Sequence, residues 1–416
     1  MTVDESTTGS ELARTFNYWT TAPEDPHPVL ATLRSQCPVA HSDELGGHWL
    51  VTSYAGVRTV LTDAATFSSR VLTLPPEGAP PLLIPESIDP PDHAKYRRVF
   101  TPYFTPRRIE QMREVVRRHA VRLVEAFVAN GGGDFVEAFT VPLPCTVFME
   151  LAGLPVADLQ QLLEWKELFL RDGISDDPEK RQNVADNVMP AMMDYFNAAL
   201  DEREGAADPP DDLLTGLLTG ALDSSGTTMT RDEVLNSLLL LLAAGLDTVT
   251  SALGLSMELL ALRPDLRRRI ASDRDVIPSA TEEFLRYFSL VTTCRQAMTD
   301  TVVDGVQVQK GDFLAAITPA ACRDEAQFPK ADEINLERSP NPHLAFGAGP
   351  HRCLGSHLTR MEMAVAFEEI HRLMPEYFAT PDIERHHRFG TVIGIDSLHL
   401  TVGSQNESTP AHVAST

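Results

Sequence analysis

The sequence is poor in cysteine and has no excess of positive charge. Its 416 residues include five scattered cysteines, and none of them forms a Cys-x-x-Cys pair. An odd number of scattered cysteines argues against a disulfide framework or a structural zinc site, and it is typical of a reducing cytoplasm. The formal net charge of −24 argues against a nucleic-acid binder and against a protein drawn to anionic membranes.

A long hydrophobic run and a targeting segment are also missing. The strongest apolar run, residues 238–246, is much shorter than a membrane span and leads directly into Asp247. Residues 1–15 are polar and acidic, without the basic start and apolar centre of a signal peptide. We therefore expect a soluble, cytoplasmic protein.

Apolar residues at helical spacing dominate the rest of the chain. They predict helices over residues 108–129, 156–170, 187–200 and 358–373. A capping box from Thr230 to Glu233 opens the longest helical pattern, which ends before Pro264. Strand-like patterns are fewer and fall at residues 48–53, 301–315 and 392–402. We predict a mainly α fold with a small β component (α+β), in which a single domain over residues 21–403 lies between a flexible N-terminus (1–20) and a flexible tail (404–416).

One cysteine, Cys353, stands in a glycine-rich loop just before a predicted helix. The loop, residues 346–355, reads FGAGPHRCLG. The dipole of the helix and nearby backbone N–H groups favour the thiolate form there, and the glycines let the backbone approach a flat ligand. Phe346 is placed to cover the sulfur from one side. Axial ligation of a haem iron requires such a thiolate. From an isolated Gly-x-Cys-x-Gly, an ordinary loop cysteine would be the alternative interpretation.

A second unusual segment, residues 243–248, interrupts the long helical pattern with the sequence AAGLDT. Gly245 inside a helix costs about 1 kcal/mol relative to alanine. Asp247 follows an apolar run, and burying its carboxylate is costly unless a partner satisfies it. The Thr248 hydroxyl can bond a carbonyl one turn earlier. An acid beside an alcohol suits proton delivery to bound dioxygen, whereas a helix kink with Asp247 paired to a distant basic residue is the competing interpretation.

The loop around Cys353 resembles the haem-binding signature of the cytochrome P450 family, Phe-x-x-Gly-x-His/Arg-x-Cys-x-Gly, at every fixed position. Residues 243–248 are similar to the family's Ala/Gly-Gly-x-Asp/Glu-Thr motif. The resemblance covers residues 25–403 and implies the cytochrome P450 fold, a triangular helical domain with a long central helix over a haem b. It makes Cys353 the iron ligand, Asp247 the catalytic acid and Thr248 the catalytic alcohol, with Phe346 and Gly245 beside the cofactor.

The resemblance also implies which residues bind the haem propionates, whose burial calls for cationic or strongly donating partners. Residues 89–97, DPPDHAKYR, are similar to a family segment whose His and Arg contact a propionate, which here are His93 and Arg97. Arg295 and His351 fall at two further propionate positions. Glu283 and Arg286 match the family's Glu-x-x-Arg motif, for which the resemblance implies a structural network behind the cysteine loop.

Local segments, such as residues 84–91, are most similar to the camphor hydroxylase and other terpenoid-oxidising bacterial members. Carried over by position, the substrate pocket includes Thr248 together with Leu240, Ala243, Ala244, Val291, Thr391 and Val392. This wall is apolar and suits a small hydrocarbon-like substrate. The tyrosine that binds the camphor ketone falls near Pro81, and a bulky family residue is reduced to Ala243, so a roomier site is expected. Residues 72–83 are expected to form part of the entrance.

The chain has no Gly-x-Gly-x-x-Gly fingerprint and no flavin or iron–sulfur segment, so its electrons must come from outside. Residues 95–122 concentrate positive charge, including Arg97, Arg98, Arg107 and Arg108. They read either as a solvated helix face or as a docking patch for an acidic ferredoxin served by a reductase. The predicted function is a haem-thiolate monooxygenase that uses O2. The alternatives are an H2O2-driven peroxygenase and a haem-based sensor or binding protein.

Overall fold

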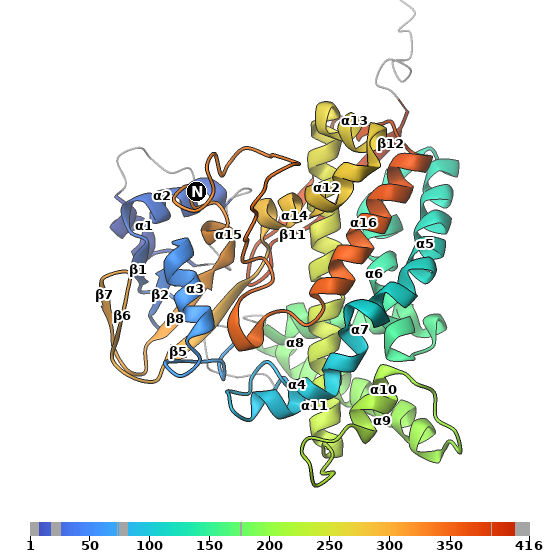
Figure 1. Cartoon of the computed structure of the whole chain (residues 1–416), viewed down its shortest axis with the longest axis horizontal. Helices are drawn as coiled ribbons and strands as arrows, with labels where there is room; N and C mark the ends of the chain where they lie inside the picture. Colours follow the sequence, from blue (N-terminus) through green and yellow to red (C-terminus); the bar gives the residue numbers. More distant parts are fainter. Residues whose placement is uncertain are drawn as a thin grey trace, which may run out of the picture.

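The computed structural model describes residues 8–17, 26–72, 74, 82–174, 177–383 and 385–403. Helices fill one side of the molecule, and the largest sheet lies at the other (Figure 1). The longer helices are α5 (Pro106–Ala129), α6 (Pro142–Ala152), α7 (Leu159–Arg171), α9 (Met189–Gly205), α11 (Arg231–Gly245), α12 (Thr248–Leu262), α14 (Ile277–Phe288) and α16 (Ser356–Leu373).

Shorter helices connect these to one another and to the sheets. They are α1 (Gly9–Arg14), α2 (His27–Gln36), α3 (Tyr54–Thr62), α4 (His93–Phe100), α8 (Pro178–Asn183), α10 (Leu213–Thr219), α13 (Pro264–Ser272) and α15 (Thr318–Ala321). The short 3-10 and π segments are η1 (Thr101–Phe104), η2 (Val136–Thr140), η3 (Val156–Asp158), η4 (Asp172–Ile174), η5 (Val184–Val188), η6 (Arg274–Val276) and η7 (Gly349–His351).

The largest sheet joins three strands from the N-terminal part of the chain with two strands from residues 292–317, in the order β1-β2-β8-β5-β3, with β2 and β8 parallel and the other pairs antiparallel. Its strands are β1 (Val39–Ser42), β2 (His48–Val51), β3 (Phe67–Ser68), β5 (Thr292–Ala297) and β8 (Phe313–Ile317). The smaller sheets contain β4 (Gly132–Asp134), β6 (Thr301–Val303), β7 (Val306–Val308), β9 (Tyr377–Ala379), β10 (His386–Arg388), β11 (Gly394–Ser397) and β12 (His399–Val402).

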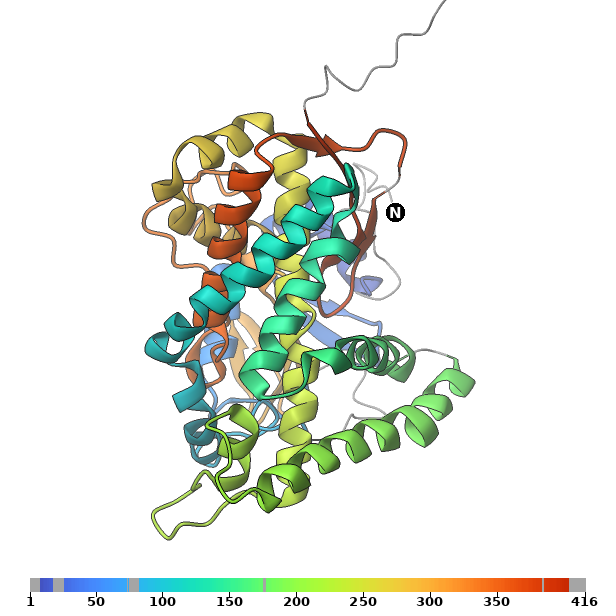
Figure 2. The same ribbon diagram turned by 90° about the vertical axis from the view of Figure 1, so that its right-hand side faces the viewer.

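Helices α11 and α12 form the centre of the helical side and follow one another in a single column (Figures 1 and 2). The predicted capping box is present, because the Thr230 side chain accepts from the backbone of Glu233 and the Glu233 side chain accepts in return. The column is interrupted at Leu246 and Asp247, the position where the sequence pattern breaks. It is the only described stretch long and apolar enough to cross a membrane, and 67% of its most apolar window is buried inside the protein. It is therefore a core helix.

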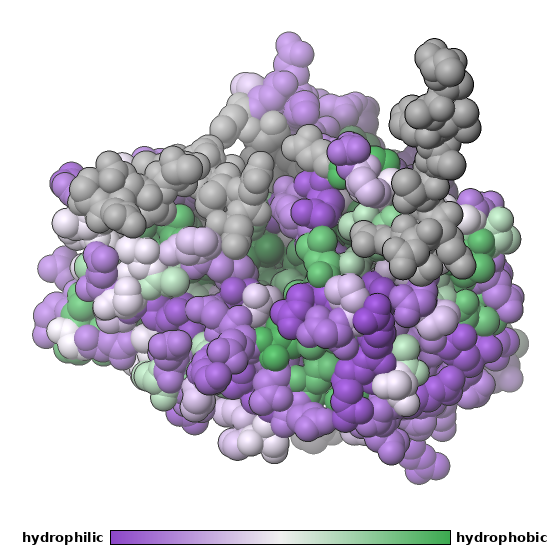
Figure 3. All heavy atoms as spheres, turned by 90° about the horizontal axis from the view of Figure 1, so that it is seen from above, coloured by the Kyte–Doolittle hydropathy of each residue, from purple (hydrophilic) through white to green (hydrophobic). Residues whose placement is uncertain are grey.

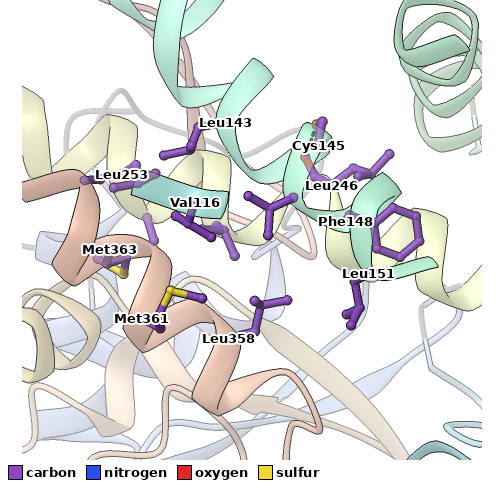
Figure 4. Close-up of a cluster of buried hydrophobic side chains, with 14 of the residues drawn as sticks. Val116, Leu143, Cys145, Phe148, Leu151, Leu246, Leu253, Leu358, Met361 and Met363 are labelled. Carbon is purple, nitrogen blue, oxygen red and sulfur yellow. Dashed lines mark hydrogen bonds between the residues drawn. The ribbon is translucent and has the colours of Figure 1, made fainter. Parts of the chain in front are cut away.

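The main core lies between this column and helices α5, α6 and α16. Val116 of α5, Leu143 of α6, Leu253 of α12 and Met361 of α16 point toward one another (Figure 4). Helix α6 is buried on nearly every side. On the outside, hydrophilic residues cover most of the face seen in Figure 3, and hydrophobic ones occur there as small separate areas. The core thus fixes α16, and with it the loop that precedes α16, against the central column.

Most predicted elements are confirmed, and one prediction differs from the structure. The single strand expected at residues 392–402 is two strands, β11 and β12, which pair with different partners on either side of Leu398. Within the N-terminal segment of residues 1–20, the described residues 8–17 contain α1, whose residues Leu12 and Ala13 are buried against Leu30 and Leu33 of α2. Residues 1–7, residues 18–20 and the tail from residue 404 lie outside the described residues.

Candidate active site

Cys353 lies where the sequence places it, three residues before α16 begins at Ser356. Its N–H donates to the carbonyl of Phe346, 2.8 Å away, which closes the loop. Gly347 and Gly349 have φ values of 65° and 71°, a region that favours glycine. At Gly349 a side chain is also excluded, because a Cβ would lie 2.6 Å from the carbonyl oxygen of Leu61 in α3.

The electrostatics of Cys353 differ from the prediction. The sequence predicts a thiol whose pKa is lowered by the helix start, but burial of the surrounding groups raises the pKa of Cys353, and the Gly355 N–H, Arg97 and Arg352 only partly oppose this. The residue as a whole is nevertheless exposed, as a ligand-binding loop position requires. A bound metal ion deprotonates a coordinating thiol by itself. The thiolate therefore depends on the metal more than on the helix dipole.

The central column has an accessible stripe in its middle. Leu238, Leu239 and Leu242 are buried, as are most residues of α12, but Leu240 and Thr248 are half-buried and Ala244 is exposed. These three residues are spaced four apart and so share one helical face. Ala243 beside them is also half-buried. A core helix that leaves small side chains accessible on one face borders a space, as the predicted pocket wall requires.

The other predicted wall residues come together at a second place. Val291 pairs with Val392 in an isolated antiparallel bridge, and the N–H of Thr292 donates to the carbonyl of Thr391 at 2.9 Å. Val291, Thr391 and Val392 are all half-buried. The predicted entrance is described only at residue 72, residue 74 and residues 82–83, and the position of Pro81 lies outside the described residues.

Asp247 and Thr248 occupy the interruption between α11 and α12. The Thr248 hydroxyl donates to the carbonyl of Ala244 at 3.0 Å, the bond that the sequence predicts. Asp247 is buried and ion-paired twice, with Arg388 of β10 at 2.9 Å and with Lys166 of α7 at 3.6 Å. The Arg388 guanidinium also donates to Ser251 and Asp396. The acid and alcohol therefore stand side by side, and the acid carries the basic partners that the competing interpretation expected.

Gly245, which the resemblance places beside the cofactor, also borders helix α6. A Cβ built on it would lie 3.3 Å from the ring of Phe148, so α6 fills the space next to this glycine. Phe346 is buried, and its ring lies under the Arg360 guanidinium, 4.4 Å from the ring centroid. The Phe346 carbonyl thus closes the cysteine loop, and the Phe346 ring has a cation against its face.

The four residues predicted to bind propionates form one cluster. The rings of His93 and His351 are 4.2 Å apart, and Arg97 donates to the carbonyl of Arg352. Arg295 is buried. Both nitrogens of His351 and Nε2 of His93 are buried without a hydrogen-bond partner. Buried polar atoms normally have partners, so this cluster has hydrogen bonds left for a ligand. Two guanidiniums and unpartnered imidazoles are the chemistry that two buried carboxylates need, and these residues fit a haem.

Burial also determines the charge state of this cluster. It lowers the pKa of His351 to about 3, assisted by Arg295, His93 and Arg97. The pKa of His93 is lowered in the same way. One residue that the sequence reasoning did not assign joins the cluster: Glu86 lies 3.8 Å from both Arg295 and His351. Its only signal in the sequence was its position in the 84–91 segment.

The residues Glu283 and Arg286, for which the resemblance implies a structural network, form a buried ion pair. Arg286 and Glu283 are fully buried and joined by two hydrogen bonds of 2.8 Å. Arg286 also donates to the carbonyls of Cys322 and Ala331, and Arg338 donates to Glu283 at 3.0 Å. Every strong bond of this pair goes to the protein, which leaves none for a ligand.

The predicted docking patch is only partly free. Arg97 points into the propionate cluster, and Arg108 is paired with Asp211 at 3.0 Å. Arg98 and Arg107 are exposed, and within the described residues neither has an ion-pair partner. The patch is therefore smaller than the sequence indicates.

Comparison with known proteins assigns the molecule to the haem enzymes that insert oxygen into organic substrates. The sequence profile of the family "Cytochrome P450" matches residues 157–372. The chain is 36% identical to the mycinamicin IV hydroxylase/epoxidase of Micromonospora griseorubida, over 79% of this chain and 82% of that protein. It is 30% identical to the vitamin D(3) 25-hydroxylase of Pseudonocardia autotrophica, over 96% and 99%.

Solved structures agree with this assignment. The crystal structure of CYP101J2 superposes with a TM-score of 0.83 at 30% identity and covers 94% of this chain and 96% of that one. The chain belongs to the cytochrome P450 family. It has the cytochrome P450 fold, its cofactor is haem b, and its class of reaction is that of the bacterial cytochrome P450 monooxygenases.

Proposed function

We propose that the protein is a cytoplasmic haem-thiolate monooxygenase that hydroxylates a small apolar, terpenoid-like substrate with O2 and electrons from an external ferredoxin. Cys353 would hold the iron, and His93, Arg97, Arg295 and His351 would hold the propionates. When bound, the haem supplies the oxidising chemistry for insertion into a C–H bond. The observation that carries the proposal is the accessible Thr248 and Ala244 face on a buried helix, next to an ion-paired Asp247.

Thr248 would hold a proton-donating water at the reacting oxygen. Its hydroxyl hydrogen is already committed to the Ala244 carbonyl, so its oxygen lone pairs are left to accept from a water. Asp247 would pass protons inward from the solvent side. To do so its carboxylate must exchange one cationic partner for water, and Lys166 at 3.6 Å is held less closely than Arg388 at 2.9 Å. Lys166 is thus the partner expected to be exchanged first.

Replacement of Thr248 by Ala tests the proposal against its alternatives. A monooxygenase that loses this hydroxyl should release hydrogen peroxide in place of product, whereas a haem sensor should keep its ligand affinity and a peroxygenase its H2O2-driven turnover. Thr250→Ala is a matched control. The Thr250 hydroxyl makes the same bond one turn back, to Leu246 at 3.1 Å, but the residue is buried. Equal peroxide release by the two variants would contradict the role of Thr248.

Replacement of Cys353 by Ser tests the iron ligand separately. The wild-type ferrous carbonyl complex should show the red-shifted Soret band of sulfur ligation, and the Cys353→Ser variant should lose it. A wild-type complex without that band would contradict the proposal. Cys322, buried with its sulfur accepting from the Leu344 N–H at 3.1 Å, offers a control cysteine whose replacement should leave the band unchanged.

The proposed substrate class rests on the apolar, small side chains of the stripe and on the likeness to camphor-type members. The two relatives are named for mycinamicin IV and vitamin D(3), so larger substrates are the alternative, and Ala243 and Ala244 leave room for them. A panel of monoterpenes, steroids and macrolides should be screened by the low-to-high-spin shift of the haem. A shift with macrolides alone would overturn the terpenoid assignment.

The proposed docking surface for the ferredoxin is centred on the two exposed cations Arg98 and Arg107, with Arg352 beside the cysteine loop. Exposed cations attract an acidic partner and raise the association rate more than the affinity. Arg97 and Arg108 are left out of this surface because their guanidiniums bind within the protein.

A further inference from the structure

Glu86 is an acidic side chain placed among cations that the propionates need. It lies in the turn just before α4, and its two carboxylate oxygens face different residues. Oε1 lies 3.8 Å from Nη2 of Arg295, and Oε2 lies 3.8 Å from Nδ1 of His351. Both distances exceed a hydrogen bond. Within the described residues no group donates a hydrogen bond to Glu86, so this carboxyl group lies near two basic partners without being hydrogen-bonded to them.

The surroundings of Glu86 favour its neutral form. Burial raises the pKa of Glu86 to about 7, although the Arg295 and Arg97 guanidiniums oppose the shift. The titratable and charged groups around it come from four elements of the chain, and they are Arg295 of β5, His93 and Arg97 of α4, His351 of η7 and the Cys353 thiol of the following loop. Asp89 lies further away, where it accepts from Ser68 and Ser69.

A charge count shows why a proton is needed here. Two propionates and Glu86 make three carboxyl groups, and the permanently charged partners are the two guanidiniums of Arg97 and Arg295. The imidazoles of His93 and His351 do not supply the missing charge, because burial and the neighbouring guanidiniums lower the pKa of both. A buried unpaired negative charge is costly. Ionising all three carboxyl groups leaves one negative charge without a cationic partner, and this raises the proton affinity of Glu86.

We infer that Glu86 is the third carboxyl group of the propionate site and that it takes up a proton from solvent when the haem iron is reduced. The external donor supplies one electron, the ferric haem becomes ferrous, and the Glu86 carboxylate becomes a carboxylic acid. The added electron would lower the total charge of the site by one, and the proton on Glu86 would restore that total. The inference rests on the proposed propionate contacts, and it adds to them a coupling between electron transfer and pH.

The sign of the coupling follows from the charges. Ionised Glu86 places a negative charge beside the haem and stabilises the ferric state, whereas the protonated side chain does not. The reduction potential should therefore fall as pH rises through the range in which Glu86 ionises. The equilibrium constant for reduction should change by about tenfold in total, the size expected for unit charges about 10 Å apart inside a protein.

Redox titration of the purified holoenzyme between pH 5.5 and 8.5 tests this. The wild type should show the fall in potential, and Glu86→Gln should show a flat profile near the wild-type value at low pH. Glu282→Gln is the matched control: this carboxylate accepts from Arg360 at 2.6 Å, and the pKa of Glu282 is about 2, so it is ionised over the whole range. Its replacement should leave the pH dependence in place, whatever constant shift of the reduction potential it causes.

Two further variants make each result decisive. Glu86→Asp keeps a titratable group, so it should retain a pH dependence even if the Gln variant binds haem poorly. A wild-type potential that does not change with pH, or a dependence that survives in Glu86→Gln, would overturn the inference. Haem retention by Arg295→Leu separates this from the proposed function: if that variant holds haem as the wild type does, the propionate site itself is misplaced.

Discussion

Two glutamates near the cysteine loop have the same ordinary pKa of 4.5 and are shifted in opposite directions. Burial raises the pKa of Glu282, but hydrogen bonds from His343 and Arg360 outweigh it and bring the value to about 2. The Glu86 side chain is as exposed as that of Glu282, but within the described residues no hydrogen bond offsets the effect of burial, and the pKa of Glu86 rises to about 7. Partners at 2.6–3.1 Å reverse the effect of burial on Glu282, and partners at 3.8 Å do not reverse it on Glu86.

The same contrast separates the two buried arginines of the site. Arg286 is bound on several sides by Glu283 and by backbone carbonyls. Arg295 donates only locally, to Thr293 and to the carbonyl of Cys294, and its other neighbour is the loosely held Glu86. A charged group that supports the fold makes its hydrogen bonds to the protein, whereas a charged group proposed to bind a ligand has donors left for that ligand. The number of hydrogen bonds to the protein therefore separates Arg286 from Arg295.

The largest effect is expected at the buried ion pair of Arg286 and Glu283. Arg286→Leu leaves Glu283 buried with one strong partner fewer, and loss of one member of a buried pair costs about 3–5 kcal/mol. Urea unfolding of the variant should show this loss in the free energy of unfolding. Arg263→Leu, which removes an exposed pair with Asp265, is the control and should change stability by less than about 1 kcal/mol. Equal losses would contradict the contrast.

A smaller effect is expected at Arg295, which makes few hydrogen bonds to the protein. Arg295→Leu should weaken haem retention by about ten- to a hundredfold, because a hydrogen bond to a charged group contributes about 1.5–3 kcal/mol. Transfer of haem to an acceptor apoprotein measures this. The thermal unfolding of the haem-free protein should change little, since Arg295 binds few protein groups. If the haem-free protein is destabilised as much as by Arg286→Leu, Arg295 is a structural residue.

The two glutamates predict opposite responses to pH. The depressed pKa of Glu282 means that the unfolded state binds more protons between about pH 4.5 and pH 2, so the stability from this residue is present above pH 4.5 and is lost as the pH falls toward 2. After allowance for its partial exposure, about 1–2 kcal/mol is expected. Glu282→Gln should reduce the acid dependence of the free energy of unfolding in this window. An unchanged profile would contradict the assignment.

The weakest effect concerns the exposed cations Arg98 and Arg107, for which the described part of the chain provides no ion-pair partner. Arg107→Glu should slow reduction by an acidic ferredoxin by a few-fold at low ionic strength, and the difference should disappear in high salt because exposed charges are screened. Stopped-flow reduction of the haem measures the rate. Arg181→Glu on α8 is a charge-matched control and should leave the rate unchanged. A salt-independent difference would mean that Arg107 acts through the fold.

Helices and strands whose apolar residues recur at a regular spacing could be predicted from the sequence. Helix α5 begins two residues before its predicted range, and the hairpin β6–β7 lies within the predicted strand-like range 301–315. Helix α6 could not be predicted in this way, because it is buried on nearly every side and has no amphipathic pattern. The two strands at the C-terminus were predicted as one because their separate partners, β10 and β9, cannot be seen locally.

The site could be predicted only where motifs carry it. Cys353, Thr248 and the propionate cluster came from contiguous patterns, and the structure brings the cluster together. Arg388 could not be found, because it meets Asp247 from 141 residues away and nothing in its own segment marks it. The pKa of Cys353 was predicted in the wrong direction, since sequence shows the helix start but not the surrounding burial.

The parallel pairing of β2 with β8 has a consequence for synthesis of the chain. Trp49 of β2 lies opposite Leu314 of β8. Strand β2 can therefore pair with β8 only after about three-quarters of the chain has been translated. Contacts so distant in sequence slow folding, and unpaired strand edges invite aggregation meanwhile. The N-terminal hairpin must therefore remain incomplete on the ribosome, which makes it the place where chaperones or misfolding would act first.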